Sequence, residues 1–452
     1  MIGSPFVLFS YGPKPRKPFW SPRELAKYVH SSDLAWSSRA PRATFLGRAR
    51  DPGPNSFGLA LSSSSFIVSR GSDLEVFDFI VEKHKPRPAR WAFRGPRIVR
   101  GSLPLDNIQG IAVMPTSIWS NPNQDVELCV ARLTTLTRVR VLKYDHEQQR
   151  QKFSNAAVEV TAHYQRPPRQ KPIQAFTASR NTMVTFSDDC ILSLYNAAAP
   201  WIPPQTFSPF GAGKVNIWCA RVSPMAPTPF VAFGGSVPLS LFALENFGSK
   251  RDAFAVLSDK GDHPLSVNSL CRLPDDIVSP PWGSMDQIIA SGWYDGSVRF
   301  HDLRSDHRNK QGHLLPMLKL HDRTGSGGAL YCLAIGGGGG TRVVGGRANH
   351  GIVSIWDLRN SDGTIYNFNE PSINDISFVA KGGWSIFPPE SNWSSTHDLA
   401  LEGSRIWGVG HQGPFLLDFS PESQLGRHFG TRYPIPTIYE HNVERSIVVN
   451  LQ

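Results

Sequence analysis

The sequence predicts an all-β fold, a seven-bladed β-propeller preceded by a short, partly helical N-terminal arm. Two observations support this fold class. The 452 residues include 39 glycines and 37 prolines but only 19% charged residues, a composition typical of many short strands joined by turns. One strand ending also recurs seven times along the chain, which indicates seven similar units. The same composition excludes a collagen, a coiled coil and a helical repeat array.

The recurring ending consists of alternating apolar residues, then an aromatic residue, then Asp or Asn. Successive endings lie 47 to 67 residues apart. Five copies occur at residues 74–78 (LEVFD), 141–145 (VLKYD), 192–196 (LSLYN), 298–302 (VRFHD) and 353–357 (VSIWD). Weaker copies end at Ala243 and Asp418. We interpret each copy as the third strand of one unit.

The unit that ends at Asp302 shows how the strands within a unit are arranged. Alternating apolar residues at 267–271 and 288–292 predict two earlier strands, and Asp295-Gly296 predicts the turn between the second and the third. A fourth, outer strand is expected in each connection, for example at residues 314–320. Because each unit buries only one face against a neighbour, the units are expected to stack around an axis as propeller blades.

The last unit ends its third strand near Phe419 and needs a further strand from elsewhere in the chain. We expect residues 43–49, ahead of the first repeat, to complete this blade, and residues 429–433 are the alternative. Such closure removes an exposed sheet edge. The predicted organisation is therefore an arm at residues 1–42, the propeller at residues 43–435 and a tail at residues 436–452.

No arrangement of residues predicts catalysis, so the protein is not expected to be an enzyme. The glycine run at 336–340 lacks the Lys and Ser or Thr that follow a phosphate-binding loop. The five cysteines are widely separated, which supports neither a zinc site nor a disulfide framework, and we expect no metal and no cofactor. No apolar stretch approaches the ~18 residues of a membrane helix, and residues 1–11 lack the charged segment of a secretory signal, so no such signal is expected. A cytoplasmic or nuclear location is expected.

The Trp356-Asp357 ending is typical of propellers of the WD40 kind. Blades of that kind commonly hold a hydrogen-bonded set of His, Ser or Thr, Asp and Trp. In the fifth unit His263 and Asp295 are expected to form such a pair, and His301 stands in the place of the Trp. We interpret these residues as structural, because buried hydrogen bonds would stiffen the blades.

Candidate binding residues follow the second strand of each unit, where a propeller displays loops around its central channel. Equivalent positions hold Arg70, Arg132, Trp293, Arg347 and His411, while Gly235 adds no side chain. Arginine and tryptophan dominate interface energetics, and arginines bind acidic or phosphorylated peptides by bidentate hydrogen bonds. The alternative is that all five are ordinary exposed turn residues.

The net charge of +10 is concentrated in proline-broken segments, above all at residues 83–100. A basic loop of this kind can hold nucleic acid or an acidic partner. The alternative is a solvated loop with no partner. The loop motivates a second hypothesis for function, a generic WD40 scaffold in a chromatin-associated or RNA-associated complex.

The C-terminal half carries a family resemblance. The stretches IIASGWYDGSVRFHDLRS, LHDRTGSGGALYCLAI and GIVSIWDLRN occur in this order, and the chain resembles the dactylin-like F-box/WD-repeat proteins. The resemblance implies a substrate-recognition subunit of a Skp1–cullin–F-box ubiquitin ligase, in which an F-box binds Skp1 and the propeller presents the target. Prolines break the first part of the arm, and residues 21–36 predict at most one helix, so the F-box itself is expected to be truncated or absent.

Overall fold

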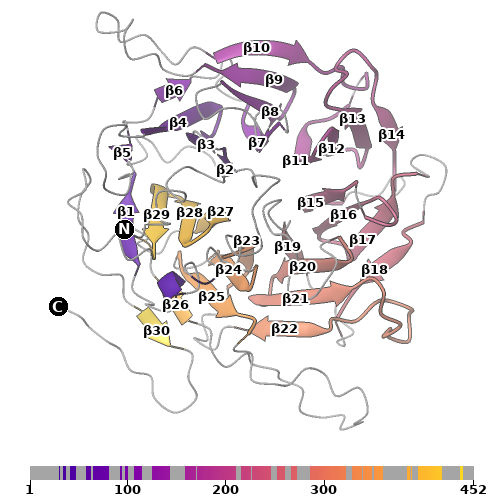
Figure 1. The fold of residues 1–452 in the computed structure, drawn as a ribbon. Coiled ribbons are helices and arrows are strands. Elements are labelled where there is room, and N and C mark those ends of the chain that lie inside the picture. The colour runs from indigo at the N-terminus through magenta and orange to yellow at the C-terminus, as the bar shows by residue number, and fades with distance from the viewer. Residues whose placement is uncertain are drawn as a thin grey trace, which may run out of the picture.

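The computed structural model contains almost only β-strands, arranged as seven blades around a central channel (Figure 1). It describes residues 30, 34–36, 41–46, 57–62, 65–80, 92–93, 97–99, 106–114, 125–142, 158–168, 170–209, 215–224, 226–245, 252–259, 266–271, 286–321, 328–337, 340–348, 351–359, 384–386, 388, 395–419 and 438–440. The predicted fold class, an all-β seven-bladed propeller, is confirmed.

The first four blades follow one another along the chain. Blade one contains β2 (Phe57–Leu61), β3 (Ser65–Arg70), β4 (Asp73–Ile80), β5 (Ala92–Phe93) and β6 (Arg97–Val99). Blade two contains β7 (Ile108–Val113), β8 (Val126–Arg132), β9 (Leu136–Val141) and β10 (Val158–His163). Blade three contains β11 (Ile173–Ser179), β12 (Thr182–Ser187), β13 (Leu192–Asn196) and β14 (Gln205–Phe207). Blade four contains β15 (Ile217–Ser223), β16 (Phe230–Gly235), β17 (Leu239–Ala243) and β18 (Ala255–Leu257).

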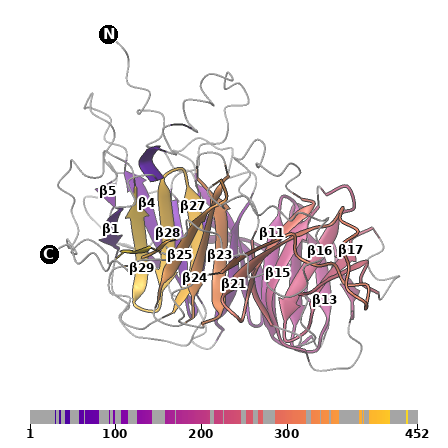
Figure 2. The ribbon, with the colours of Figure 1, turned by 90° about the horizontal axis from the view of Figure 1, so that it is seen from below.

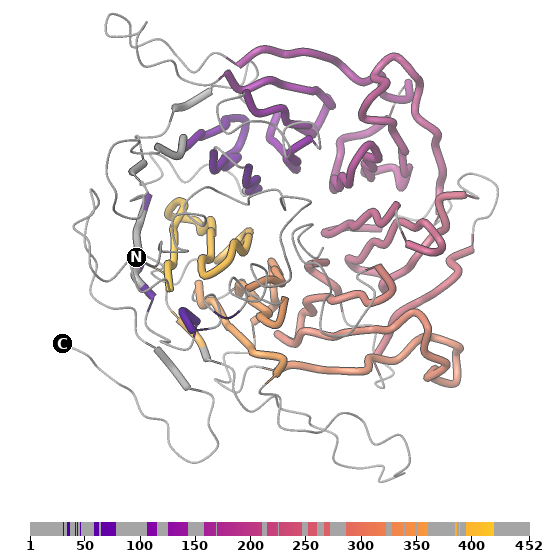
Figure 3. Tube along the Cα trace, viewed as in Figure 1, coloured from indigo at the N-terminus to yellow at the C-terminus, as the bar shows by residue number. Residues whose placement is uncertain are grey.

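The last three blades complete the circle, as the colour gradient of the trace shows (Figure 3). Blade five contains β19 (Val267–Cys271), β20 (Ile288–Trp293), β21 (Ser297–Asp302) and β22 (Leu318–His321). Blade six contains β23 (Leu330–Gly336), β24 (Arg342–Arg347), β25 (Val353–Asp357), β26 (Trp384–Ile386) and β30 (Ile438–Glu440). Blade seven contains β27 (Thr396–Glu402), β28 (Arg405–Gly410), β29 (Gly413–Asp418) and β1 (Arg42–Phe45).

The ring is closed by the segment that the sequence predicted. β1 pairs antiparallel with β29, in a register from Arg42 opposite Asp418 to Phe45 opposite Phe415. The alternative segment, residues 429–433, lies outside the described residues. The region expected as a tail contributes β30, which pairs with β26 on the outside of blade six.

One predicted outer strand needs correction. Residues 314–320 were expected to form it, but β22 begins only at Leu318. Leu314 instead bridges to Leu257 of blade four, and its backbone N–H donates to the carbonyl of Val256 at 2.8 Å. The connection before β22 therefore reaches across to the neighbouring blade, where it covers part of the outer strand β18.

The first strand of each blade lines the central channel, and each such inner strand contacts the next around the ring: β2, β7, β11, β15, β19, β23, β27 and β2 again. Each blade runs through four antiparallel positions from its inner to its outer edge, so the chain leaves a blade at the face where it entered. All inner strands therefore run in the same direction. We call the face where they begin the mouth face and the opposite face the arm face. Apolar clusters between neighbouring blades form the core. One of them joins Phe66 of blade one to Trp407 of blade seven.

The N-terminal arm is anchored on the arm face by a helical turn at residues 34–36, indigo in the side view (Figure 2). Trp36 is 2% exposed and stacks on Phe419 with ring centroids 4.3 Å apart. Its indole N–H donates to the carbonyl of Gly403 at 2.9 Å. Gly403 lies in the turn between β27 and β28, so the arm is fixed to blade seven.

Candidate binding site at the channel mouth

Six of the seven inner strands carry a β-bulge at the same point, directly after their first residue at the mouth. The register shifts between Ile108 and Gly110, and at the equivalent position in five further inner strands, β11, β15, β19, β23 and β27. In blade one, β2 pairs with β3 without a shift. The residues left without a cross-strand partner are Gln109, Gln174, Trp218, Asn268, Tyr331 and His397. We call these six residues the bulge ring.

The bulges expose side chains at the mouth because an extra residue re-aims its side chain out of the regular pleat. Trp218 is 48% exposed and Tyr331 is 42% exposed, although their strand neighbours are mostly buried. The other four members are half-buried. A large aromatic side chain that stays exposed on an inner strand gives up the free energy of burial, and bulges of this kind often lie next to binding or active sites.

Contacts between strand beginnings hold the bulge ring together. The Sγ of Cys219 lies 3.5 Å from the carbonyl oxygen of Val267, and the Oγ of Ser269 donates to the carbonyl of Leu330 at 3.2 Å. The Sγ of Cys332 lies 3.5 Å from the carbonyl oxygen of Thr396. Trp218, Asn268, Tyr331 and His397 therefore follow one another around one side of the mouth.

Aromatic rings gather on blades six and seven. The ring of Tyr331 stacks on that of His397 with centroids 6.2 Å apart, and His397 lies 6.4 Å from the ring of His411. Burial, followed by the nearby His411, lowers the pKa of His397 to about 4, so this imidazole is neutral at physiological pH. Tyr294, 61% exposed, stands at the mouth end of blade five. This side of the mouth is therefore rich in aromatic rings.

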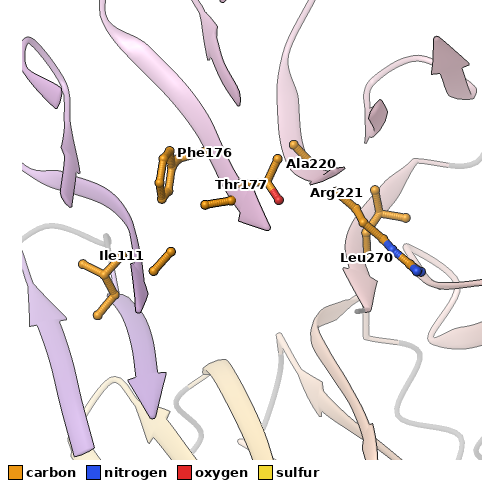
Figure 4. Close-up of a pocket in the computed structure, with 8 residues that line it drawn as sticks. Ile111, Phe176, Thr177, Ala220, Arg221 and Leu270 are labelled. Carbon is orange, nitrogen blue, oxygen red and sulfur yellow. The ribbon is translucent and has the colours of Figure 1, made fainter. Parts of the chain in front are cut away.

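Apolar side chains lie below the bulge ring. The residue two positions after each bulge is apolar in all six strands: Ile111, Phe176, Ala220, Leu270, Leu333 and Leu399. Leu333 and Leu399 are buried in the clusters between blades, whereas the first four residues are partly exposed. The first four line a pocket of about 190 Å³ together with Ala112, Thr177, Ala178 and Arg221 (Figure 4).

Gly110 lets the Phe176 ring pack closely against β7 at the wall of the pocket. A Cβ at this position would lie 2.9 Å from the ring of Phe176, too close for any larger residue without movement. The glycine thus lets Phe176 lie against β7. In Figure 4, Phe176 and Ile111 stand on one side of the pocket, opposite Ala220 and Leu270.

Arg221 belongs to the wall but does not offer its charge to the pocket. Its guanidinium donates to the carbonyl of Cys271 at 2.7 Å and to the Oγ of Ser223 at 3.2 Å, and it lies 3.6 Å from the carboxylate of Asp286. The side chain points away from the pocket toward blade five (Figure 4). The Oγ1 of Thr177 accepts from the backbone N–H of Val222 at 3.3 Å.

The five binding residues predicted from the sequence lie beside the bulge ring, on the second strands or just after them. Trp293 and Arg347 are 2% and 1% exposed, which leaves a partner little to touch. Arg70 is ion-paired with Glu75 at 2.8 Å, and Arg132 donates to the carbonyl of Ser72 at 2.7 Å. His411 is half-buried. A binding role for these five residues stays a prediction.

Trp293 forms part of a buried network inside blade five. The guanidinium of Arg299 lies 4.1 Å from the centre of the Trp293 ring and pairs with Asp259 at 2.6 Å and Asp295 at 2.7 Å. Asp295 also accepts from the Oγ of Ser297 at 2.6 Å. His263, the partner expected for Asp295, lies outside the described residues.

The other predicted structural residues are buried within blades five and six. His301 is fully buried, its Nε2 lies 3.0 Å from the carbonyl oxygen of Ser258, and burial lowers its pKa to about 4. Trp356 is fully buried in the apolar cluster between these two blades. Asp357 is ion-paired with Arg342 and, at 3.0 Å, with Arg359.

Sequence reasoning missed the bulge ring. Each member follows an apolar residue, except in blade seven, where Thr396 takes that place, and precedes a small or short one, as in Leu330-Tyr331-Cys332. A polar or large aromatic residue at the second position of six inner strands is a repeated signal. Aligning the beginnings of the units rather than their endings would have revealed it.

The described residues show no group of three His, Cys, Asp or Glu side chains that could hold a metal ion. None of the five cysteines forms a disulfide, and burial raises the pKa of Cys129, Cys219 and Cys271 to about 12. Such thiols are poor nucleophiles. In the described part of the chain, no helix is long and apolar enough to cross a membrane. Most of the basic segment 83–100 lies outside the described residues.

Comparisons with known proteins agree with the fold. No family model matches the chain, and no curated protein does. The resemblance to dactylin-like proteins therefore stays a prediction. Among solved structures, Raptor of Chaetomium thermophilum is similar with a TM-score of 0.53 and 11% identity, over 89% of this chain. The match spans only 32% of the Raptor chain. This likeness and the seven blades show that the chain is a seven-bladed β-propeller compatible with WD40 repeats.

Proposed function

We propose that the protein is a non-catalytic interaction scaffold whose bulge ring binds a protein partner. The observation that carries the proposal is the bulge in six of seven inner strands, which brings aromatic and amide side chains to one channel mouth. Exposed aromatic residues supply large contact areas at low cost in conformational entropy, and they are common anchors of protein interfaces.

The finer proposal is that the scaffold is the substrate-recognition subunit of a Skp1–cullin–F-box ubiquitin ligase. The order of repeats that resembles dactylin-like proteins motivates this role. The position of Trp36 supports it, because the arm is fixed on the face opposite the bulge ring. A ligase component on the arm and a target at the mouth would not compete for the same surface.

Affinity purification of the tagged full-length chain from cytoplasmic and nuclear extracts tests both levels. The ligase role requires Skp1 and a cullin among the co-purified proteins, which depends on enough of an F-box being present, and the scaffold role requires further partners. The double variant Trp218→Ala/Tyr331→Ala should keep Skp1 and lose partners that bind at the mouth. Trp201→Ala is the matched control, because Trp201 is 71% exposed but lies in the connection between β13 and β14 on the arm face.

The outcomes separate the two proposals. If Skp1 and cullin are absent while mouth-dependent partners are present, the ligase role is refuted and the scaffold stands. If the double variant and the wild type co-purify the same proteins in the same amounts, the bulge ring is not the interaction site.

A further inference from the structure

We infer that the channel pocket below the bulge ring receives one bulky, uncharged side chain of a peptide segment in the partner. The inference rests on the proposed function, since it names the chemistry of what the scaffold binds. It concerns the pocket and the mouth as a single continuous site.

The strands connect the pocket to the mouth. On each of β7, β11, β15 and β19, the pocket residue follows the bulge residue by two positions, as Phe176 follows Gln174 and Ala220 follows Trp218. Two residues of extended chain span about 7 Å. A side chain that enters between the bulge residues therefore reaches the pocket within its own length.

The pocket is open rather than sealed. Seven of its eight lining residues are partly exposed, Arg221 being the exception. An enclosed cavity would leave all of them buried.

The chemistry of the wall selects an uncharged occupant. Ile111, Phe176 and Leu270 contribute the large surfaces, and the polar groups of Arg221 and Thr177 are already engaged with their neighbours. A charged group brought into such a wall would lose its water without gaining an opposite charge. A phenyl or branched aliphatic group loses no hydrogen bonds there, and its burial is favourable.

The size of the pocket favours one side chain over a free small molecule. Pockets for cofactors and drug-sized ligands measure about 300–1,000 Å³, whereas this pocket holds about 190 Å³.

A random-sequence peptide library, screened against the purified full-length chain, tests the inference directly. We expect enriched peptides to share Phe, Trp, Leu, Ile or Met at one position, without charge at that position. Replacing this anchor with Ala in a synthetic peptide should weaken binding roughly tenfold to hundredfold, as measured by fluorescence anisotropy.

Two substitutions in the wall test the location. Ala220→Leu fills the pocket and should weaken binding by at least about tenfold, and Phe176→Ala removes its aromatic wall and should also weaken it. Trp201→Ala on the arm face should leave the affinity unchanged. Thermal unfolding shows which variants remain folded, and two independent wall variants keep the test decisive if one of them does not fold.

The results distinguish this inference from the proposed function. Enrichment of a charged anchor, or unchanged affinity in folded Ala220→Leu and Phe176→Ala, overturns the apolar-anchor inference and leaves the scaffold standing. A Trp218→Ala/Tyr331→Ala variant that binds every peptide and partner as the wild type does overturns the proposed function itself.

Discussion

Replacement of Trp36 by alanine tests how firmly the N-terminal arm is fixed to the propeller. The indole is 2% exposed, stacks on Phe419 at 4.3 Å and donates to the carbonyl of Gly403 at 2.9 Å. The guanidinium of Arg342 lies 5.9 Å from its ring centre. The substitution removes the apolar contact, the stacking and the hydrogen bond together.

The magnitude follows from these contacts. Truncation of a buried Trp to Ala costs about 3–5 kcal/mol of unfolding free energy, because the transfer energy is lost and a cavity remains. Trp36→Phe keeps most of the apolar contact and loses the N–H donor, so its cost should be about 1–2 kcal/mol. Leu34→Ala is the matched control in the same helical turn, since Leu34 is 57% exposed and its truncation should change stability by less than about 0.5 kcal/mol.

Urea unfolding followed by far-ultraviolet circular dichroism measures the three variants without relying on tryptophan fluorescence. The expected order of stability is wild type and Leu34→Ala, then Trp36→Phe, then Trp36→Ala. If Trp36→Ala is no less stable than Leu34→Ala, the indole does not anchor the arm and our account of the arm face is refuted.

Three further predictions concern the blades themselves. The pKa of His301 is lowered to about 4 from an ordinary value near 6.5, so its contribution to stability is present above pH 6.5 and lost as the pH falls toward 4. Between about pH 7 and pH 4, the stability advantage of the wild type over His301→Gln should shrink by about 3 kcal/mol in urea titrations, and a constant difference would contradict this. Arg299→Ala should lower the unfolding free energy measured by calorimetry by about 3 kcal/mol, because the carboxylates of Asp259 and Asp295 lose a buried partner. Arg304→Ala is the control: the Arg304 side chain is 47% exposed, so its loss should lower the unfolding free energy by less than about 1 kcal/mol. Gly235→Ala should give little soluble protein, because its Cβ would lie 2.0 Å from the carbonyl oxygen of Asn216, and normal yield and melting temperature would argue against that close approach.

The repeated endings predicted the blades because they report a local property. Most copies end a third strand whose alternation is visible in five residues, as in Val353–Asp357. The copy at residues 141–145 was misplaced, because β9 ends at Val141, where that copy begins. Closure by the segment before the first repeat was also predictable, since a propeller must complete its last sheet. The predicted start at Ala43 differs from β1 by one residue.

The bulge ring was not predictable from alternation alone. In Leu330-Tyr331-Cys332 the apolar residues keep their regular spacing, so alternation within this one strand does not show the bulge, which appears in the pairing of β23 with β24. The choice of Trp293 and Arg347 as binding residues assumed that a residue at a strand end is exposed, whereas packing between blades buries both. The anchoring of Trp36 depends on a partner 367 residues away, a separation that no local pattern can report.

The pairing of β1 with β29 has a consequence for the order in which the molecule is made. More than 370 residues separate Arg42 from its partner Asp418, so a ribosome that adds 5–20 residues per second needs roughly 20 to 75 seconds between them. Throughout that interval β1 lacks the strand that it pairs with in the propeller, and a strand without a partner is open to pairing with other chains. The completed ring can form only after synthesis has passed residue 418, so the edge of β1 stays available to other chains until then.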